Sequence, residues 1–337
     1  MHFLSLFLAQ PEGLMPGSKD KYRLNQPNSG KTRNRSTHAD SSAGLEPLLE
    51  NIRQKHGDKL LAILVYGSWL RGKRDTMLDF YVLVEDYRTL DSSWQGLMCR
   101  LLPPNVYHIY DESAERDSED PGLRAKYALL TLERFQRAMQ HDFHSYFWAR
   151  FAQACEILYV RDESTALGLA ESFKSASATF IRRVVPAMQE RFSSKELWTR
   201  GLSLTYQCEL RTENRNRGES IYAFNPAYYD DLTRTFAVEN MQLIMPEKHD
   251  IYSNRSSAFA RKISPLSWWL RRFQGKLLSA LRLLKAAFTF NQPLEYLLWK
   301  IERHSGLYIE PSHRQIKHPL VFAWPLLWRL YRKGAFR

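Results

Sequence analysis

Residues 60–84 read LLAILVY, then GSWLRGKRDTM, then LDFYVLV, so two apolar runs flank a short polar segment. The apolar runs cover residues 60–66 and 78–84 and are rich in β-branched and aromatic residues. Short apolar runs of this composition are typical of buried β-strands. Gly67 and Ser68 follow the first run directly, and this pair is typical of a turn. The segment therefore predicts strand, turn and strand.

The neighbouring segments extend this pattern in both directions. We expect a helix from Glu46 to His56 with Gly57 as its C-cap, because apolar residues recur at helical spacing before the glycine. Further along the chain the pattern predicts a strand at 106–110, helices at 129–140 and 143–153, and a short strand at 156–160. Together these elements predict an α/β domain over residues 45–165.

Residues outside this domain fall into three parts. The segment 1–44 is rich in Ser, Asn, Gly and Arg, so we expect a disordered tail there. Residues 166–256 predict a mostly helical, winged-helix-like domain, in which Ser193 caps a helix with Glu196 three positions later. Residues 257–337 predict a basic region of amphipathic helices that associates with membranes.

Composition excludes several classes of protein. The chain has 337 residues, of which 44% are hydrophobic and 25% are charged, so it is not a fully disordered or collagen-like protein. Its three cysteines, Cys99, Cys155 and Cys208, are scattered and lack the paired spacing of a zinc site or a disulfide framework. A reducing compartment is the simplest interpretation.

Positive charge is concentrated at one end of the chain. The formal net charge is +12, and residues 255–337 hold 16 Lys and Arg against 3 Asp and Glu. Residues 1–254 hold 32 and 33, which is nearly neutral. A segregated basic block favours a surface that meets a polyanion, either nucleic acid or an anionic membrane.

The turn and the second strand together resemble the site of polymerase-β-type nucleotidyltransferases. Such a turn at a helix N-terminus offers backbone N–H groups to a triphosphate, and Gly67 allows close approach of the backbone. The Ser68 hydroxyl is a donor for a phosphate oxygen, and Asp79 on the next strand is a hard ligand for Mg²⁺. The alternative is structural, because Gly-Ser pairs are common in turns and a strand Asp is often only a satisfied polar residue.

The pattern lacks a second carboxylate two residues after the first. Tyr81 stands at that position, and Glu85, six strand residues from Asp79, would lie about 20 Å away. If two metal ions bind, Asp111 or Glu112 after the third strand are the candidates for the second carboxylate.

Several further motifs resemble those of one family, the mitochondrial-type phosphatidate cytidylyltransferases (translocator assembly and maintenance family, CDP-diacylglycerol synthases). They occur in the family's order over roughly residues 58–215. The matching pieces are Tyr66-Gly67-Ser68, Met77-Leu78-Asp79-Phe80, Glu85-Asp86, Asn105-Val106-Tyr107, Lys126-Tyr127, Trp148-Ala149-Arg150-Phe151, and Phe192 to Trp198 followed by Gly201-Leu202-Ser203.

This resemblance implies a Mg²⁺-dependent reaction in which CTP and phosphatidic acid give CDP-diacylglycerol and pyrophosphate. It implies that Ser68 and Asp79 are catalytic and that Asp79 holds the metal. It also implies that Tyr66, Gly67 and Ser68 bind the nucleotide and its phosphates, and that Lys126 and Arg150 contact phosphates; without the resemblance, both cations could equally be solvated surface charges.

The chain also departs from the family pattern. Trp69 replaces a small residue after the turn, which predicts narrower access for a nucleotide. Gln153 and Ala154 replace a Lys-Pro pair, so one cation is missing. These differences leave open an altered substrate or a weakened enzyme.

The C-terminal block contains a predicted basic amphipathic helix at 265–290. Its apolar residues follow helical spacing, and five of the nine tryptophans lie in the block. The residues expected to meet a membrane are Trp268, Trp269, Arg271, Arg272 and Lys276. The alternative is a helix that packs its apolar face on the protein core and leaves its charges in solvent. No aromatic stacking platform for nucleic acid is visible, so no nucleic-acid partner is expected.

The leading hypothesis is therefore a peripheral membrane cytidylyltransferase. It would lie on the cytoplasmic face of a bacterial inner membrane or on the matrix side of the mitochondrial inner membrane. Two alternatives stay open. One is a different nucleotidyltransferase acting on nucleic acid or a small acceptor, and the other is a non-catalytic membrane-binding protein on a decayed transferase scaffold.

Overall fold

The structure of the chain is a computed structural model, and it describes most of the residues between the two ends. The described residues are 44–72, 77–87, 97, 100–110, 124–210, 217–247 and 250–289. The predicted disordered tail, apart from Gly44, and the predicted membrane region beyond Thr289 lie outside them.

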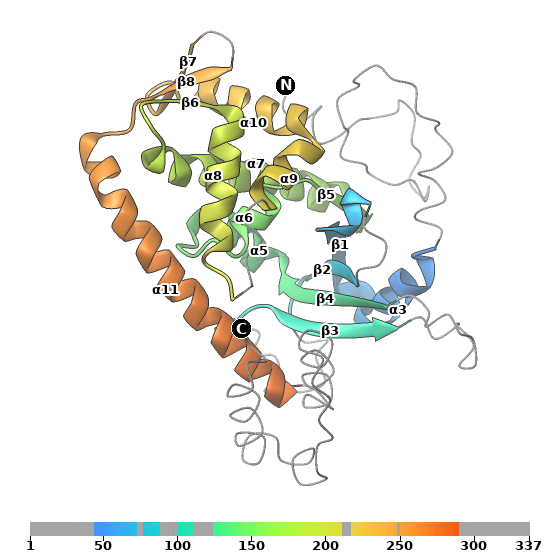
Figure 1. Ribbon diagram of the computed structural model, residues 1–337. Helices are drawn as coiled ribbons and strands as arrows, with labels where there is room; N and C mark the ends of the chain where they lie inside the picture. Colours follow the sequence, from blue (N-terminus) through green and yellow to red (C-terminus); the bar gives the residue numbers. More distant parts are fainter. Residues whose placement is uncertain are drawn as a thin grey trace, which may run out of the picture.

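A five-stranded mixed sheet forms the base of the molecule (Figure 1). Its strands lie in the order β3-β4-β2-β1-β5, with β2 and β4 parallel and the other neighbours antiparallel. The bounds are β1 Leu60–Tyr66, β2 Leu78–Val84, β3 Asn105–Tyr110, β4 Arg124–Thr131 and β5 Cys155–Val160. The predicted bounds of the first two strands are confirmed.

Both faces of this sheet are largely buried, which explains why strands β1 and β2 at its centre are apolar except at Asp79. Side chains alternate across a strand, so Ile63 and Val65 face a core closed by helix α3 (Glu46–His56). Ala62 and Leu64 face the opposite core, which is closed by α5 (Leu132–His141), α6 (Trp148–Phe151) and α7 (Glu163–Val184). The expectation of an α/β unit is thereby confirmed.

The structure corrects two of the predicted helices. The segment 124–131 is strand β4, and α5 begins only at Leu132, after Thr131 caps it by accepting a hydrogen bond from the Arg134 backbone N–H at 3.2 Å. The segment 143–153 contains only the short helix α6. The apolar run at 127–130 belongs to a strand between β3 and β2, and a short buried run does not distinguish strand from helix.

The second half of the chain is mostly helical and shares the larger core with the sheet. It contains α7, α8 (Ser194–Tyr206), α9 (Arg217–Phe224) and α10 (Pro226–Glu239). A small antiparallel sheet, β6 (Arg191–Ser193), β8 (Ile251–Asn254) and β7 (Ile244–Pro246), lies beside these helices. The Ser193–Glu196 capping box is confirmed at the start of α8. Phe180 of α7 stacks on Trp198 of α8 with ring centroids 4.5 Å apart.

Helix α11 (Ala258–Thr289) runs along the outside of the molecule (Figure 1). Its buried side chains are mostly polar or cationic, with Trp268 among them: Ser264, Trp268, Arg271 and Lys285. Arg271 Nε donates to the Phe143 carbonyl at 3.0 Å, and Arg282 Nε donates to the Pro103 carbonyl at 2.9 Å. Lys285 Nζ donates to the Leu102 carbonyl at 2.6 Å and to two further oxygens just before and in β3. These cations hold the helix to the α/β unit through backbone oxygens.

The apolar side of α11 consequently faces outward. Its exposed residues recur every three or four positions and form what we call the apolar stripe: Phe259, Ile263, Leu266, Leu270, Phe273, Leu277 and Leu281. This arrangement is the reverse of the alternative in which the apolar face packs on the core. Phe273, for example, is 63% exposed, whereas Trp268 on the inner side is 2% exposed.

The same orientation corrects part of the predicted membrane-facing set. Trp268 is buried against Trp148 and Arg271 is 6% exposed, so neither side chain reaches an outer surface. Trp269 and Lys276 are exposed, and Arg272 is half-buried. No helix within the described residues is both long enough and apolar enough to cross a bilayer.

Candidate active site

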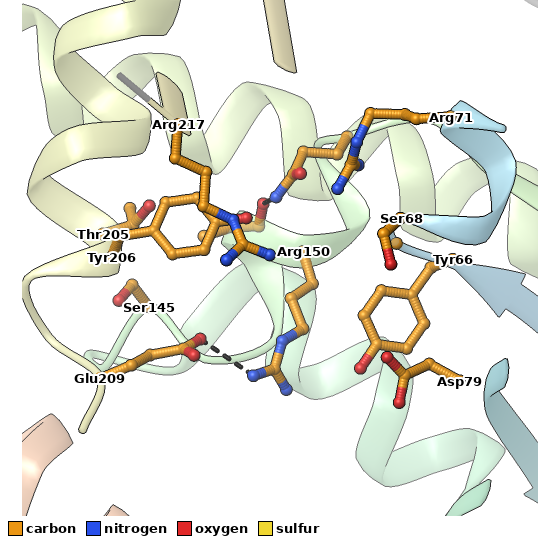
Figure 2. A pocket seen from close by; sticks show the side chains of 13 residues that line it. Tyr66, Ser68, Arg71, Asp79, Ser145, Arg150, Thr205, Tyr206, Glu209 and Arg217 are labelled. Atoms are coloured by element: carbon orange, nitrogen blue, oxygen red, sulfur yellow. Dashed lines mark hydrogen bonds and ion pairs between the residues drawn. The ribbon is translucent and has the colours of Figure 1, made fainter. Parts of the chain in front are cut away.

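A polar pocket that is partly open to solvent lies where the sheet meets the helical half (Figure 2). The sheet contributes the turn after β1 and the first residues of β2, and the helices α6, α8 and α9 provide the opposite side. Its lining residues are Tyr66, Gly67, Ser68, Arg71, Asp79, Ser145, Ala149, Arg150, Gln153, Thr205, Tyr206, Glu209 and Arg217. Four predicted residues of the turn and strand, Tyr66, Gly67, Ser68 and Asp79, are therefore brought together with Arg150.

Gly67 places backbone directly beside the Asp79 carboxylate. Its φ is +95°, a left-handed conformation that residues with a Cβ rarely adopt. A Cβ built on Gly67 would lie 3.8 Å from Asp79 Oδ2, so the turn and the carboxylate share the same corner of the pocket. Antiparallel pairing explains this, because Val65 pairs with Phe80 and the two chains leave the ladder side by side.

The turn differs from the predicted opening of a helix. Ser68 is followed by the three-residue 3₁₀ turn η2 (Trp69–Arg71), which ends at Gly72 with φ +84°. A turn this short lacks the aligned dipoles of a full helix N-terminus. The arginine that closes the turn, Arg71, instead brings a full positive charge to the pocket.

Asp79 is paired with Lys126 on the neighbouring parallel strand. The two residues are register partners, and Lys126 Nζ lies 2.9 Å from Asp79 Oδ1. Oδ1 is buried and still accepts no hydrogen bond, because the ion-pair contact lies outside hydrogen-bond geometry. A buried carboxylate oxygen without a hydrogen bond fits a hard cation such as Mg²⁺, for which Asp79 would be the protein ligand.

The other carboxylate that lines the pocket is Glu209, which is paired with Arg150. No group of three or more His, Cys, Asp or Glu residues gathers within the described part of the chain. The candidates Asp111 and Glu112 lie outside the described residues. Mg²⁺ often binds proteins through one or two carboxylates together with substrate phosphates, so the single ligand Asp79 is compatible with it.

Arg150 lines the pocket but is already engaged by protein groups. Its Nη1 donates to the Tyr81 hydroxyl at 3.0 Å and its Nη2 donates to Glu209 at 2.9 Å (Figure 2 shows the contact with Glu209). Burial lowers the pKa of Arg150, but Glu209 and the tyrosine hydroxyls outweigh burial and keep the pKa well above its usual value. Tyr81, which stands at the position of the missing second carboxylate, thus accepts a hydrogen bond from the positively charged Arg150. Phosphate binding by Arg150 remains a prediction.

Two tyrosines beside Arg150 respond differently to this environment. Burial raises the pKa of Tyr66 well above its usual value. Burial also raises the pKa of Tyr146, but Arg150 and Arg282 outweigh it, and the net pKa lies below the usual value. The Arg150 guanidinium carbon lies 3.7 Å from the centre of the Tyr146 ring. Tyr66 is therefore a neutral hydroxyl at physiological pH.

Two residues that differ from the family pattern, Trp69 and Gln153, lie in different places. Trp69 is not among the lining residues and packs beside the core under α3. Gln153 lines the pocket, but its Nε2 donates to the Ala149 carbonyl at 2.9 Å.

Sequence reasoning missed Arg71, Tyr206 and Arg217. Arg71 stands three residues after Ser68, so its spacing from the turn could have indicated it. Arg217 lies far along the chain and carries no motif, so only the fold brings it to the pocket.

Known proteins show little similarity to this chain. No protein-family model matches it, and no curated protein matches it. Among solved structures it is similar to a nucleotidyltransferase-like protein from Exiguobacterium sibiricum, with 10% sequence identity and a TM-score of 0.24, over 87% of this chain and 92% of the other.

Proposed function

We propose that the protein is a Mg²⁺-dependent nucleotidyltransferase, and that its reaction is CTP plus phosphatidic acid giving CDP-diacylglycerol and pyrophosphate. The observation that carries the proposal is the meeting of the Gly67 turn and the Asp79 carboxylate in one corner of a polar pocket. Exposed backbone beside a metal-binding carboxylate is the arrangement that a triphosphate with its metal requires. The lipid acceptor rests on the family resemblance.

The chain's own residues would act by binding and orienting the reactants. The backbone at Gly67 and the Ser68 hydroxyl would hold the phosphates, and Lys126, beside Asp79, would add positive charge at the same corner. A phosphate oxygen of the acceptor would form a bond to the α-phosphorus of CTP, and the bond from that phosphorus to the bridging oxygen would break and release pyrophosphate. A bound Mg²⁺ would neutralise charge on the phosphates.

We further propose that the reaction takes place at an anionic membrane surface. The exposed side chains Lys262, Trp269 and Lys276 recur every seven residues, so they lie in a row along one flank of the apolar stripe. Cations and tryptophan beside an apolar stripe are the composition of interfacial helices. The excess of Lys and Arg over residues 255–337 is complementary to anionic lipids.

The direct test is an assay with labelled CTP, Mg²⁺ and vesicles that contain phosphatidic acid. We expect CDP-diacylglycerol to form, and omission of Mg²⁺ to stop it. Vesicles with phosphatidylcholine alone are the control for acceptor dependence. Absence of any CDP-lipid with the wild-type protein would refute the proposed reaction.

A second candidate function is nucleotide binding without transfer, on a decayed transferase scaffold. Tyr81 favours it, because it fills the place of a second carboxylate and engages Arg150 instead of a metal. Calorimetry with CTP and Mg²⁺ separates the candidates when it is combined with the vesicle assay. Binding without product supports the decayed scaffold, whereas product formation excludes it.

A further inference from the structure

We propose that Arg71 and Arg217 form a two-arginine subsite that binds a phosphoryl group, on the side of the pocket opposite to Arg150 and Glu209 (Figure 2). The inference rests on the proposed function, because it assigns to that same pocket the residues that hold a phosphate of the nucleotide or of the acceptor.

Positive charge exceeds negative charge among the described residues that line the pocket. Asp79 is paired with Lys126 at 2.9 Å, and Glu209 is paired with Arg150 at 2.9 Å. Each of the two lining carboxylates thus has a cation beside it. Arg71 and Arg217 form no ion pair with any carboxylate among the described residues, so within that part of the chain the lining of the pocket carries an excess of positive charge.

The two arginines come from distant segments of the chain, and burial together with the charge of Arg217 lowers the pKa of Arg71. Arg71 closes the turn after β1, and Arg217 is the first residue of α9. Figure 2 shows both guanidinium groups directed into the pocket. Burial lowers the pKa of Arg71, and the charge on Arg217 lowers it further, against the tyrosines Tyr206 and Tyr229. Two like charges held this way favour an anion between them.

The Arg217 side chain is supported in a way that leaves its donors for a ligand. The Arg217 guanidinium carbon lies 5.0 Å from the centre of the Tyr206 ring, so the ring supports the flat face of the group. The edge of a guanidinium carries its N–H donors, which match phosphate oxygens in pairs.

A phosphoryl group could reach this subsite from two sources. One is the polyphosphate tail of the nucleotide, and the other is the phosphate monoester of the acceptor. Both present a tetrahedral dianion, so the probes must differ in how that group is attached. Pyrophosphate represents the nucleotide tail, and glycerol 3-phosphate represents the acceptor headgroup without its acyl chains.

The test is calorimetric titration of the full chain with each probe, without nucleotide transfer. Arg71→Gln and Arg217→Gln are compared with wild type, and Arg200→Gln, at an exposed arginine of α8 outside the pocket lining, is the matched control. We expect each pocket variant to weaken binding of at least one probe by about tenfold, as loss of a charge-assisted hydrogen bond does, and the control to bind as wild type does. The probe that loses affinity identifies the source.

Two results would overturn the subsite. One is wild-type affinity in both pocket variants, and the other is failure of the wild-type chain to bind either probe. If a Gln variant does not fold, as judged by circular dichroism, the corresponding Lys variant is titrated in its place. Lys keeps the positive charge but lacks the planar, paired N–H donors of the guanidinium group. A probe affinity about threefold lower in the Lys variant than in the wild type supports the subsite, and an unchanged affinity overturns it.

The outcome is separable from that of the proposed reaction. Phosphate binding that depends on both arginines, with no CDP-lipid in the vesicle assay, would refute the reaction and leave the subsite. CDP-lipid formation by the wild-type chain, with undiminished probe binding in the arginine variants, would support the reaction and refute the subsite.

Discussion

Asp79 combines two properties that rarely occur together without a functional reason. Its Oδ1 is buried without a hydrogen bond, and its other oxygen faces the Gly67 backbone across the turn. An ordinary structural carboxylate in a protein interior satisfies its oxygens with hydrogen bonds. Here Lys126 provides only charge at 2.9 Å, and the side chains of both residues are partly exposed. This arrangement is the reason for the proposal that Asp79 would be a ligand of Mg²⁺.

The first prediction follows from this position. Asp79→Asn keeps the shape of the side chain and removes its charge, so we expect nucleotidyl transfer to fall by at least about a hundredfold. Stability should change by at most about 1 kcal/mol, because the lost ion pair with Lys126 is partly exposed. The vesicle assay and urea denaturation measure the two effects. Asp58→Asn, at an exposed residue outside the pocket lining, is the control, and wild-type turnover in the Asp79 variant would refute the metal role.

The second residue-scale prediction concerns His56, which is buried at the end of α3. Burial, with a smaller contribution from Lys55, lowers the pKa of His56 from 6.5 to about 4. The folded state therefore excludes a proton that the unfolded chain binds, so stability is complete above pH 6.5 and falls as the pH drops toward 4. The difference in pKa corresponds to a loss of about 3 kcal/mol.

Urea denaturation at pH 7.0 and pH 4.5 measures this loss. His56→Phe removes the titrating group, so we expect its stability to depend less on pH than that of the wild-type chain. His141→Phe, at an exposed histidine of α5, should keep the wild-type dependence. An equal pH dependence in the His56 variant and the wild type would show that other groups cause it.

At the scale of elements, local signals predicted boundaries well where one signal dominates. Gly57 ends α3, and the Ser193–Glu196 pair starts α8, because each motif satisfies backbone groups at a helix end. Strand β4 was missed because a short apolar run such as this one is found in buried helices as well as in buried strands. Only pairing with β2 and β3 assigns it to the sheet.

Helix α11 was predicted as a helix but its orientation was not. The sequence shows which residues share a face, but it does not show which face the protein covers. Carbonyl groups before β3 and at Phe143 bind Arg271, Arg282 and Lys285, and these contacts between distant segments decide the orientation. Arg217 was missed for the same reason, because its neighbours in the pocket are distant in sequence.

The third prediction tests how α11 is seated. Gly275 faces Cys208, and a Cβ built on Gly275 would lie 2.4 Å from the Cys208 carbonyl oxygen. Because that atom belongs to the backbone, Gly275→Ala must displace α11 or the end of α8. The steric cost of such a displacement is about 1–3 kcal/mol, and the gain in helix propensity from Gly to Ala offsets about 1 kcal/mol of it. We therefore expect urea denaturation to show a net decrease in the free energy of unfolding.

Gly44→Ala is the control for this substitution, because a Cβ there meets no atom within 4 Å. Limited proteolysis should in addition cut α11 faster in the Gly275 variant. Wild-type stability with wild-type proteolysis would show that α11 does not pack closely at this point.

At the scale of the whole molecule, the basic excess of the C-terminal region has two separate roles. Part of it is internal, because Arg271, Arg282 and Lys285 bind backbone oxygens of the α/β unit. The net charge of the segment therefore overstates what an external partner meets. The exposed remainder, such as Lys262 and Lys276, lies beside the outward apolar stripe, and this combination rather than charge alone favours a membrane.

The last prediction tests that surface. The triple substitution Leu270→Ser, Phe273→Ser and Leu277→Ser removes the middle of the apolar stripe, all of it exposed. We expect co-sedimentation with anionic vesicles to weaken by at least about tenfold, because three apolar side chains no longer leave water. The melting temperature should not fall, since these side chains lie outside the core.

A matched triple substitution, Leu167→Ser, Val238→Ser and Met241→Ser, changes equally exposed apolar residues outside α11 and should leave vesicle binding intact. Charge is tested separately by Lys262→Gln with Lys276→Gln, which should weaken binding to anionic vesicles and not to neutral ones. Equal binding by the stripe variant and the wild type would show that α11 does not meet the bilayer. The proposed reaction would then need another route to a lipid acceptor.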